Sequence, residues 1–484
     1  MKYFLGLDCG GTFIKAILID TEGKIVGIEK NNISTISNNA GYAERNMNEF
    51  WDACSNLIKN IINNFNIDTR LILGIGISAQ GKGTYLLDKD FNPLGNAILS
   101  SDQRANNIVN KWKKKGLDKL VYPFTKQNIW SGHPVSILKW IKDNDRDRYD
   151  KIEYILMTHD YLRFCLTGSL FCEVTNISES NLYNINTNEY DKYLSELFDI
   201  PEIFSKLSPI IKSNEVSGYI TEYASEKTGL AVGIPVIAGL FDIVSAAFCC
   251  HLENEKVLSG ILGTWNIISG VSESIKHSNS GLSQGAYIEN KVIIHDDSPT
   301  SMANLEWFRK MYGDIDYEEI NKMIESLPIC SSNIIFIPFL YGSNYKNNIQ
   351  GGIYGIQFNH SKEHLFQAIY EGVFFSFKYH LERMKEIFKN VNTLRISGGV
   401  TYSKVGLKML ADITGMKIEV LNIDEIGCYG IAIFTMKSLG FDINNIIKNI
   451  ENKKVTIHPN YNNNKIYKNK YKSYLRTLEQ LSYI

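Results

Sequence analysis

Apolar residues near the start of the chain crowd two short runs, residues 3–8 and 13–19, which flank the tight turn "CGGT". A third apolar run follows near residues 24–29, after the turn "TEGK". Short apolar runs separated by glycine turns predict three strands of an antiparallel meander. Between residues 47 and 65 the apolar positions instead recur every three or four residues, which predicts an amphipathic helix.

Strand-like and helix-like patterns alternate up to about residue 240, which is typical of an α/β protein. Residues 71–78 and 84–88 resemble short buried strands, whereas residues 102–230 are more irregular and are expected to decorate one face. The longest apolar run, residues 234–250, contains Asp242 near its middle. A membrane span would penalise this carboxylate, so we expect a buried strand that leads into a helix.

The pattern partly restarts in the second half of the chain. It predicts a strand–turn–strand unit at residues 256–272, helices at 364–384, 405–415 and 428–440, and a strand at 393–400. Small residues in the last of these helices favour close packing on a neighbour. We therefore expect two α/β lobes, residues 1–247 and 248–484, and a polar surface helix in the tail from residue 441.

The composition argues against several classes of protein. Lys and Arg number 51 against 52 Asp and Glu, and the net charge of −1 does not favour nucleic acid or an acidic membrane as partner. The eight cysteines form no CxxC pair, which argues against a zinc ribbon or a dithiol motif and suits reduced cytoplasmic thiols. Because the N-terminus resembles no signal peptide, we expect a cytoplasmic protein.

Glycine turns occur at three strand ends. "LDCGGT" places Asp8 at the end of a strand before Gly10, Gly11 and Thr12. Glycines can adopt positive φ and let the backbone approach a ligand closely. Successive N–H groups in such a turn can cradle a phosphate, and the Asp8 carboxylate could hold a phosphate-bound Mg²⁺. An ordinary hairpin turn is the alternative. "GILGTWN", with Gly263 and Thr264, repeats this arrangement in the second half, and the pair favours a nucleotide gripped between two lobes.

The third glycine turn, "SGGV", places Gly398 and Gly399 between a strand and a helix. Such a turn lets a flat ligand such as adenine lie against the backbone, although a close strand–helix crossing explains it equally well. Asp242 in "AGLFDIVSAA" is a carboxylate in an apolar stretch. It could cap the following helix, or it could act as a general base that accepts the proton of an attacking hydroxyl.

Two polar segments lie between these turns. "GISAQGKG" at residues 76–83 is one letter short of the P-loop pattern, because Gly83 stands where Ser or Thr should follow Lys82 and a strand continues where a helix is required. We therefore do not expect Lys82 to hold a nucleotide phosphate. "SSDQRA" brings Asp102 and Arg104, which could bind vicinal hydroxyls or form an ordinary surface salt bridge. Adjacent residues of a helix point in different directions, so His159 and Asp160 are interpreted as structural.

In this order, these segments resemble the FGGY carbohydrate kinases over essentially the whole chain, with "THDYLRFCLTG", "YEGVFFSF" and "GCYGIAI" among the further matches. The resemblance implies an α/β fold of two lobes with an interlobe cleft, the actin/hexokinase-like (ribonuclease H-like) ATPase fold. It implies ATP and Mg²⁺ as cofactors, with Asp8 near the metal and Asp242 as catalytic base. Gln80, Lys82, Asp102 and Arg104 would lie on the sugar side. The residues implied for ATP are Gly10, Gly11, Thr12, Gly263, Thr264, Gly398, Gly399 and Ser403.

Within the family, "ISAQGKG", "ILSSDQRA" and "NISESNLYN" are most similar to bacterial L-xylulose kinases, also described as acting on 3-keto-L-gulonate. D-Xylulose kinases have "GQMHG" where this chain has "AQGKG", and Asn where Ile243 follows Asp242. We therefore expect phosphorylation of the terminal hydroxyl of a ketose, with L-xylulose ahead of D-xylulose or 3-keto-L-gulonate. The resemblance also admits a homodimer. A non-catalytic sugar sensor and an actin-like ATPase are the alternatives of other classes.

Overall fold

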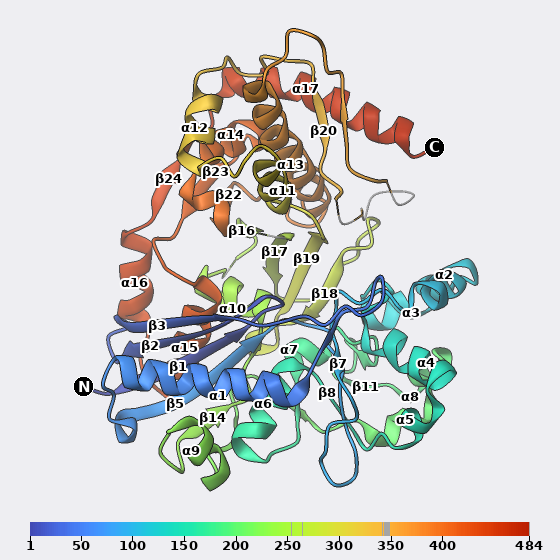
Figure 1. Cartoon of the computed structure of the whole chain (residues 1–484), viewed down its shortest axis with the longest axis vertical. Helices are drawn as coiled ribbons and strands as arrows, with labels where there is room; N and C mark the ends of the chain where they lie inside the picture. The colour runs from blue at the N-terminus through green and yellow to red at the C-terminus, as the bar shows by residue number, and fades with distance from the viewer. Residues whose placement is uncertain (253, 264, 341, 343–348, 484) are drawn as a thin grey trace.

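Figure 1 shows the computed structural model, in which the described residues are 1–252, 254–263, 265–340, 342 and 349–483. They form two lobes, each built around a seven-stranded sheet with helices against it. The N-terminal lobe lies at the bottom of Figure 1 and the C-terminal lobe at the top. This confirms the predicted fold class of a two-lobed α/β protein.

The first sheet has the order β13-β14-β5-β1-β2-β3, and β15 also pairs with β5. The antiparallel meander is confirmed, and β1, β5 and β15 run parallel with Cys9 beside Ala79 and Ala79 beside Phe241. Their carboxyl ends therefore meet at one edge. The strands of this sheet are β1 (Tyr3–Cys9), β2 (Phe13–Asp20), β3 (Ile25–Asn32), β5 (Ile72–Ala79), β13 (Val216–Tyr219), β14 (Pro235–Ile237) and β15 (Leu240–Phe241).

The second sheet, ordered β18-β19-β17-β16-β22-β23-β24, repeats this plan. Like β1, strand β16 pairs antiparallel with the next strand of a meander and parallel with a later strand, β22. The restart predicted from the sequence is thus confirmed. The strands are β16 (Val257–Leu262), β17 (Asn266–Ser272), β18 (Ser283–Ala286), β19 (Val292–Ser298), β22 (Thr393–Ser397), β23 (Lys417–Val420) and β24 (Val455–Ile457).

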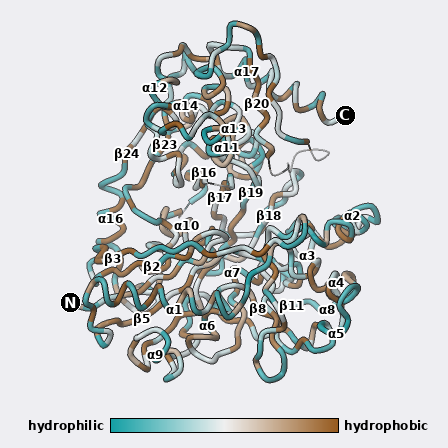
Figure 2. The backbone as a smooth tube through the Cα atoms, in the orientation of Figure 1, coloured by the Kyte–Doolittle hydropathy of each residue, from teal (hydrophilic) through white to brown (hydrophobic). Residues whose placement is uncertain are grey.

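Alternating side chains of the first sheet bury its two faces against different helices. Leu5, Leu7 and Ile14 pack with α1 (Met47–Asn64), whereas Phe4 and Ile17 pack with α15 (Ile426–Ser438). This is the period-two pattern of a strand covered on both sides. In Figure 2 the strands of this sheet carry hydrophobic stretches, while the tip around α2 (Asn106–Lys114) is hydrophilic.

Helix α15 approaches its neighbours closely, as its small residues predicted. A Cβ atom on Gly6 of β1 would lie 2.6 Å from the backbone oxygen of Cys428. A Cβ atom on Gly430 would lie 2.3 Å from the backbone oxygen of Ser245 in α10 (Asp242–Cys249). These glycines let β1, α15 and α10 pack together, and this packing fixes the two strand ends that carry Asp8 and Asp242.

The irregular segment 102–230 forms helices and short strands at one side of the first lobe, where it has a hydrophobic cluster of its own. Its helices are α2, α3 (Leu117–Thr125), α4 (Pro134–Asn144), α5 (Arg146–Asp150), α6 (Thr158–Thr167), α7 (Val174–Ile177), α8 (Lys192–Leu197) and α9 (Glu222–Thr228). The short strands of the first lobe are β4 (Glu44–Arg45), β6 (Tyr85–Leu87), β7 (Ala97–Ile98), β8 (Tyr154–Leu156), β9 (Cys172–Glu173), β10 (Tyr183–Asn184), β11 (Glu189–Tyr190) and β12 (Ile210–Ile211).

The prediction of a single surface helix in the tail is wrong. The tail forms α16 (Asn444–Asn452), the edge strand β24 and α17 (Tyr461–Leu481), and α17 buries Tyr467, Tyr471 and Tyr474 beside Phe375. The other elements of the second lobe are α11 (Ala303–Met311), α12 (Tyr317–Glu325), α13 (Lys362–Met384), α14 (Lys404–Thr414), β20 (Ile335–Ile337) and β21 (Gly352–Tyr354). Among the described residues, no helix combines the length and hydropathy that a bilayer crossing requires.

Candidate active site

Three predicted site residues come together where parallel strands of the first sheet end. Asp8 is the penultimate residue of β1, Gln80 directly follows β5, and Asp242 directly follows β15. Gln80 is also tied to β1, because its backbone N–H donates to the carbonyl of Cys9 at 3.0 Å. In open α/β sheets, ligands bind at the carboxyl ends of the strands. This edge is therefore the candidate active site.

Asp242 is partly exposed and stands at the first turn of α10. Its Oδ1 accepts a hydrogen bond from the N–H of the next residue, Ile243, at 2.7 Å. The N-cap of α10 is Phe241, and its side chain makes no capping hydrogen bond, so the helix-capping interpretation of Asp242 is wrong. Burial, followed by the charge of nearby Asp8, raises the pKa of Asp242 to about 7. A carboxyl group with a pKa near neutrality has the basicity that a general base needs at physiological pH.

Asp8 offers a carboxylate oxygen at the same edge. Burial raises the pKa of Asp8, while Lys15, at 4.0 Å from its Oδ2, opposes that rise. Lys15 is itself held by Glu425 at 2.6 Å. Oδ1 of Asp8 is buried without a hydrogen-bond partner among the described residues. A buried, unsatisfied carboxylate oxygen is an oxygen ligand of the kind that Mg²⁺ prefers.

The first glycine turn is built differently from the expectation. Gly10 and Gly11 are absent from the residues with positive φ, so that part of the prediction is wrong. The turn instead brings Gly11 close to Gln80, since a Cβ atom on Gly11 would lie 3.2 Å from Oε1 of Gln80. The carbonyl of Gly11 accepts from Nη2 of Arg45 at 2.7 Å, while Gly11 and Thr12 are exposed.

The glycines of the second lobe meet at the carboxyl ends of β16 and β22, which are parallel neighbours. Gly398 has a φ of 92°, and a Cβ atom there would lie 2.6 Å from the backbone oxygen of Leu262, just before Gly263. Gly398 and Gly399 are exposed, so their backbone is open to a ligand. Thr264 lies outside the described residues.

Ser403 faces the protein rather than solvent. It is the N-cap of α14, where its Oγ accepts from the N–H of Gly406 at 3.0 Å and donates to Oδ1 of Asn321 at 2.7 Å. Both hydrogen bonds fix the helix that follows the glycine pair. The contact of Ser403 with adenosine stays a prediction.

Lys82 adopts a φ of 68° and directs its ammonium group to a residue that the sequence patterns did not single out. Nζ lies 2.8 Å from Oε2 of Glu179, which is fully buried, and 5.9 Å from the centre of the Phe241 ring. Burial lowers the pKa of the Lys82 ammonium group, but the negative charges of Glu179 and Asp297 outweigh burial, so the pKa lies above its ordinary value. Lys82 is thus a charged, internally paired residue near Asp242.

Asp102 and Arg104 form a buried ion pair with each other. Asp102 accepts from Arg104 through both carboxylate oxygens, at 2.9 Å each, and Oδ2 also accepts from the N–H of Ala43 at 2.7 Å. Arg104 also contacts Oε1 of Glu44 at 2.5 Å and stacks over Tyr42. The salt-bridge alternative therefore describes their geometry, although the pair is buried rather than at the surface; contact with a sugar stays a prediction.

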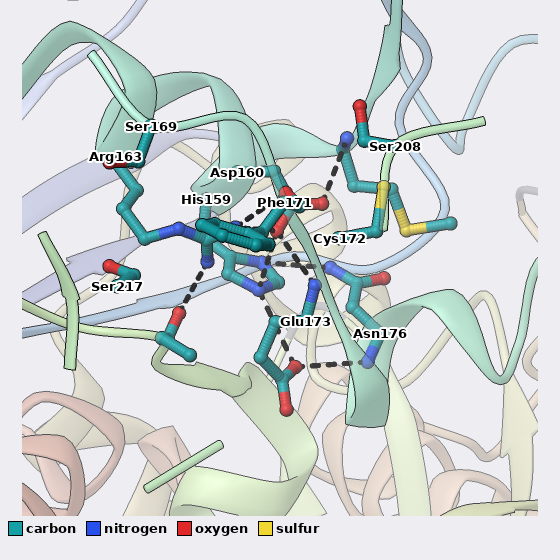
Figure 3. Close-up of polar contacts among 12 residues, drawn as sticks. His159, Asp160, Arg163, Ser169, Phe171, Cys172, Glu173, Asn176, Ser208 and Ser217 are labelled. Atoms are coloured by element: carbon teal, nitrogen blue, oxygen red, sulfur yellow. Dashed lines mark hydrogen bonds and ion pairs between the residues drawn. The ribbon is translucent and has the colours of Figure 1, made fainter. Parts of the chain in front are cut away.

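Figure 3 shows a polar cluster around His159, Asp160 and Glu173, whose side chains are buried. The expectation that the side chains of His159 and Asp160 diverge is wrong, because Nε2 of His159 lies 3.4 Å from Oδ1 of Asp160 and 3.5 Å from Oε2 of Glu173. Arg163 reaches the same Asp160 oxygen at 2.9 Å and donates to the carbonyl of Ala238 at 2.6 Å. These ionisable groups are fully buried, so they serve structure rather than contact with substrate.

The cluster holds two backbone segments of the site. Glu173 accepts from Oγ1 of Thr175 at 2.7 Å, and that hydroxyl accepts from the N–H of Phe241 at 2.9 Å, immediately before Asp242. Asn176 contacts His159 at 3.1 Å and accepts from the N–H of Lys82 at 3.2 Å through Oδ1. One buried network therefore positions both the candidate base and the candidate sugar-side lysine.

Comparison with known proteins gives the same family for both halves of the chain. Residues 3–249 match the N-terminal domain of the FGGY family of carbohydrate kinases, and residues 299–439 match the C-terminal domain of that family. The chain is 50% identical to a probable L-xylulose kinase of Haemophilus influenzae over 99% of both chains. It is 43% identical to the L-xylulose/3-keto-L-gulonate kinase of Escherichia coli, over 99% of this chain and 97% of that protein.

The fold is similar to that of a solved sugar kinase. The ligand-bound xylulose kinase from Lactobacillus acidophilus superimposes with a TM-score of 0.92 over 100% of this chain and 99% of the other, at 21% sequence identity. At that level of identity the likeness shows only the fold, which the two chains share along their whole length.

Proposed function

Because the chain belongs to the FGGY family of carbohydrate kinases, we propose that it transfers the γ-phosphoryl group of ATP to the terminal hydroxyl of L-xylulose, giving L-xylulose 5-phosphate. The observation that carries the choice of sugar is the 50% identity, over 99% of both chains, with a probable L-xylulose kinase. The geometry supports the reaction type, since a carboxyl group with a pKa of about 7 stands beside a second carboxylate at a ligand-binding edge.

In the proposed reaction, Asp242 accepts the proton of the terminal hydroxyl of the sugar. The hydroxyl oxygen bonds to the γ-phosphorus of ATP, while the bond between the γ-phosphorus and the bridging oxygen of the β-phosphate breaks and releases ADP. One Asp242 oxygen is fixed by the N–H of Ile243, which orients the other for the substrate. The network through Thr175 and Glu173 anchors the preceding residue, Phe241. Orientation of this kind is what a positioned base requires.

The nucleotide would lie between the exposed glycine turns. The N–H groups near Gly11, Gly263 and Gly399 would bind phosphate oxygens, and the backbone at Gly398 would lie against adenosine. A Mg²⁺ ion bound with ATP would neutralise the phosphate charge, and the unsatisfied Oδ1 of Asp8 fits it as ligand, directly or through water. Among the described residues there is no group of three His, Cys, Asp or Glu side chains that could hold a metal without the nucleotide.

On the sugar side, Gln80 and Lys82 lie on the loop that follows β5, next to Asp242. Nε2 of Gln80 is buried without a hydrogen-bond partner among the described residues, so it is ready to donate to a hydroxyl. Lys82 uses one ammonium donor for Glu179, which leaves others for the ketose. Asp102 and Arg104, being paired with each other, would act mainly by holding the neighbouring backbone.

The proposal is tested by ADP release from the purified protein with ATP, Mg²⁺ and, in turn, L-xylulose, D-xylulose, 3-keto-L-gulonate and glycerol. We expect the highest kcat/KM with L-xylulose and a product phosphorylated at O5. A higher kcat/KM with D-xylulose or 3-keto-L-gulonate would mean that this sugar, rather than L-xylulose, is the substrate, and it would leave the proposed reaction type unchanged. Steady ATP hydrolysis that ignores every sugar would favour an actin-like ATPase, and no ADP release at all would favour a sugar sensor.

A further inference from the structure

Glu179 joins residues from both lobes in one buried ionic chain. Its Oε2 lies 2.8 Å from Nζ of Lys82 in the first lobe, and its Oε1 lies 2.8 Å from Nε2 of His295 on β19 of the second lobe. Glu179 is fully buried and His295 is only 2% exposed. A buried carboxylate is stable only when charged or hydrogen-bonding partners compensate it. Here one of the two partners comes from the opposite lobe.

The second lobe also covers Glu179 with backbone. The N–H of Ala286 on β18 donates to Oγ of Ser178 at 2.9 Å. A Cβ atom on Gly285 would lie 2.8 Å from Oε1 of Glu179, so a larger residue there would displace this oxygen. Any relative movement of the lobes at β18 and β19 would therefore change the partners of Glu179.

The charged groups around Glu179 and His295 determine how a movement of the lobes would affect Lys82. His295 faces Glu179, Lys82 and Asp297, whose Oδ1 lies 3.8 Å from its Nδ1. Its neighbours on the adjacent strands are Ser269 and Ser283, which do not titrate. With His295 on Oε1, Glu179 holds Lys82 through Oε2; without His295, both carboxylate oxygens would be available to draw Lys82 away from the sugar.

We propose that His295 is a positioning residue that acts through Glu179 on Lys82, so that the orientation of the sugar-side lysine depends on the position of the nucleotide lobe. The inference rests on the proposed function for the role of Lys82 toward the sugar. It assigns to His295, a residue of the nucleotide lobe, an effect on sugar affinity. Binding at one lobe would thereby be coupled to binding at the other.

The test compares the KM for sugar and for ATP in His295→Ala, His295→Gln and His380→Gln. His380 is the matched control, because it forms another buried histidine–carboxylate pair in the second lobe, with Asp296 at 2.8 Å, on the residue next to His295 in the same strand. We expect His295→Ala to raise the sugar KM about tenfold with a smaller change in the ATP KM. His295→Gln, which can still donate to Glu179, should recover part of the loss, and His380→Gln should leave the sugar KM near wild type.

A double-mutant cycle with Lys82→Met separates coupling from simple damage to the fold. Because Lys82 is the residue through which His295 acts, the double variant Lys82→Met/His295→Ala should raise the sugar KM by clearly less than the product of the two single effects. Independent, multiplying effects, or a normal sugar KM in a folded His295→Ala protein, would overturn the proposal. If wild type prefers another sugar, the proposed function fails instead, and the same cycle is measured with that sugar.

Discussion

At the scale of single residues, the chemistry depends on how the surroundings set the charge of Asp242. Burial makes its carboxylate less favourable, and Asp8 adds a second negative charge nearby, while Lys82 and the N–H of Ile243 act in the opposite direction. The balance leaves a pKa of about 7. A group with this pKa changes its charge in the range in which the enzyme would work, so the rate should report its protonation directly.

The first prediction concerns pH. Since a general base works only when ionised, kcat/KM for L-xylulose should rise with pH up to a plateau above about pH 7, the pKa of Asp242 in this structure. Asp8→Asn removes the neighbouring negative charge, so it should lower the pKa of Asp242 and move the acid limb of the profile, the rise of kcat/KM with pH, to lower pH. The same change also lowers the overall rate. The pH–rate profiles of the two proteins measure the shift. A profile without an acid limb, or one that stays in place in the variant, would contradict the assignment.

The second prediction concerns Lys82. Replacing it with Met removes the ammonium group but keeps most of the side-chain length, so the KM for L-xylulose should rise severalfold while the KM for ATP changes less. Initial-rate kinetics with each substrate varied in turn give both values. A larger effect on ATP would instead indicate that the loop of residues 76–83 binds the nucleotide as a P-loop does.

At the scale of elements, the site is held by short contacts between strands, loops and helices that are distant in sequence. Asn176, in α7, fixes the backbone of Lys82, and Thr175, in the same helix, fixes that of Phe241. Helix α15 packs under β1 and beside α10, so it supports both candidate carboxylates, Asp8 and Asp242. The positions of the functional groups therefore depend on elements that need not touch substrate.

Asn176→Ala tests the clamp on the sugar-side loop. The change leaves the N–H of Lys82 and the ring of His159 without this partner, so we expect a higher sugar KM together with a loss of stability of about 1–3 kcal/mol. Asn184→Ala is the control, since Asn184 also holds a local polar contact, with Asp191 at 2.9 Å, but does not touch the loop. If both variants lose stability and neither alters the sugar KM, the clamp has no part in sugar binding.

Gly430→Ala tests the packing of α15. The added methyl group would lie 2.3 Å from the backbone oxygen of Ser245, so α15 and α10 must separate. Overpacking of this kind costs roughly 1–3 kcal/mol, which urea denaturation would measure. Ser438→Ala, near the end of the same helix, should have little effect because its hydroxyl donates to the carbonyl of Phe434 in its own helix and to no other described residue. Equal stability of the two variants would contradict the role of the close contact.

At the scale of the whole molecule, two lobes of the same plan meet around the candidate site, and much of this plan could be predicted from the sequence. The meander, the restart near residue 256 and the small-residue helix follow from apolar spacing and glycine turns, which are local signals. Asp242 stood out because a carboxylate interrupts an apolar run. The division between residues 247 and 248 stays a proposal; α10 ends at Cys249 and β16 begins at Val257.

Other features could not be read from local patterns. Glu179 lies in the polar segment "NISESN", where an acidic residue looks exposed, and its burial depends on β18 and β19 more than 100 positions later. The tail shows the same limit: most of α17 is at the surface as expected, but its buried face, with Tyr471 and Tyr474, packs beside Phe375 of α13. Tertiary partners, which no local period encodes, decide these cases.

The central claim is that Asp242 is the base of a sugar kinase, and it is tested most directly by the turnover of Asp242→Asn with saturating L-xylulose, ATP and Mg²⁺. The amide keeps the size of the side chain but cannot accept the proton, so turnover should fall by about 10²–10⁴-fold. ATP binding, measured by calorimetry on the same protein, should stay near that of wild type. Turnover within a few-fold of wild type would contradict the claim and remove Asp242 from the catalytic step.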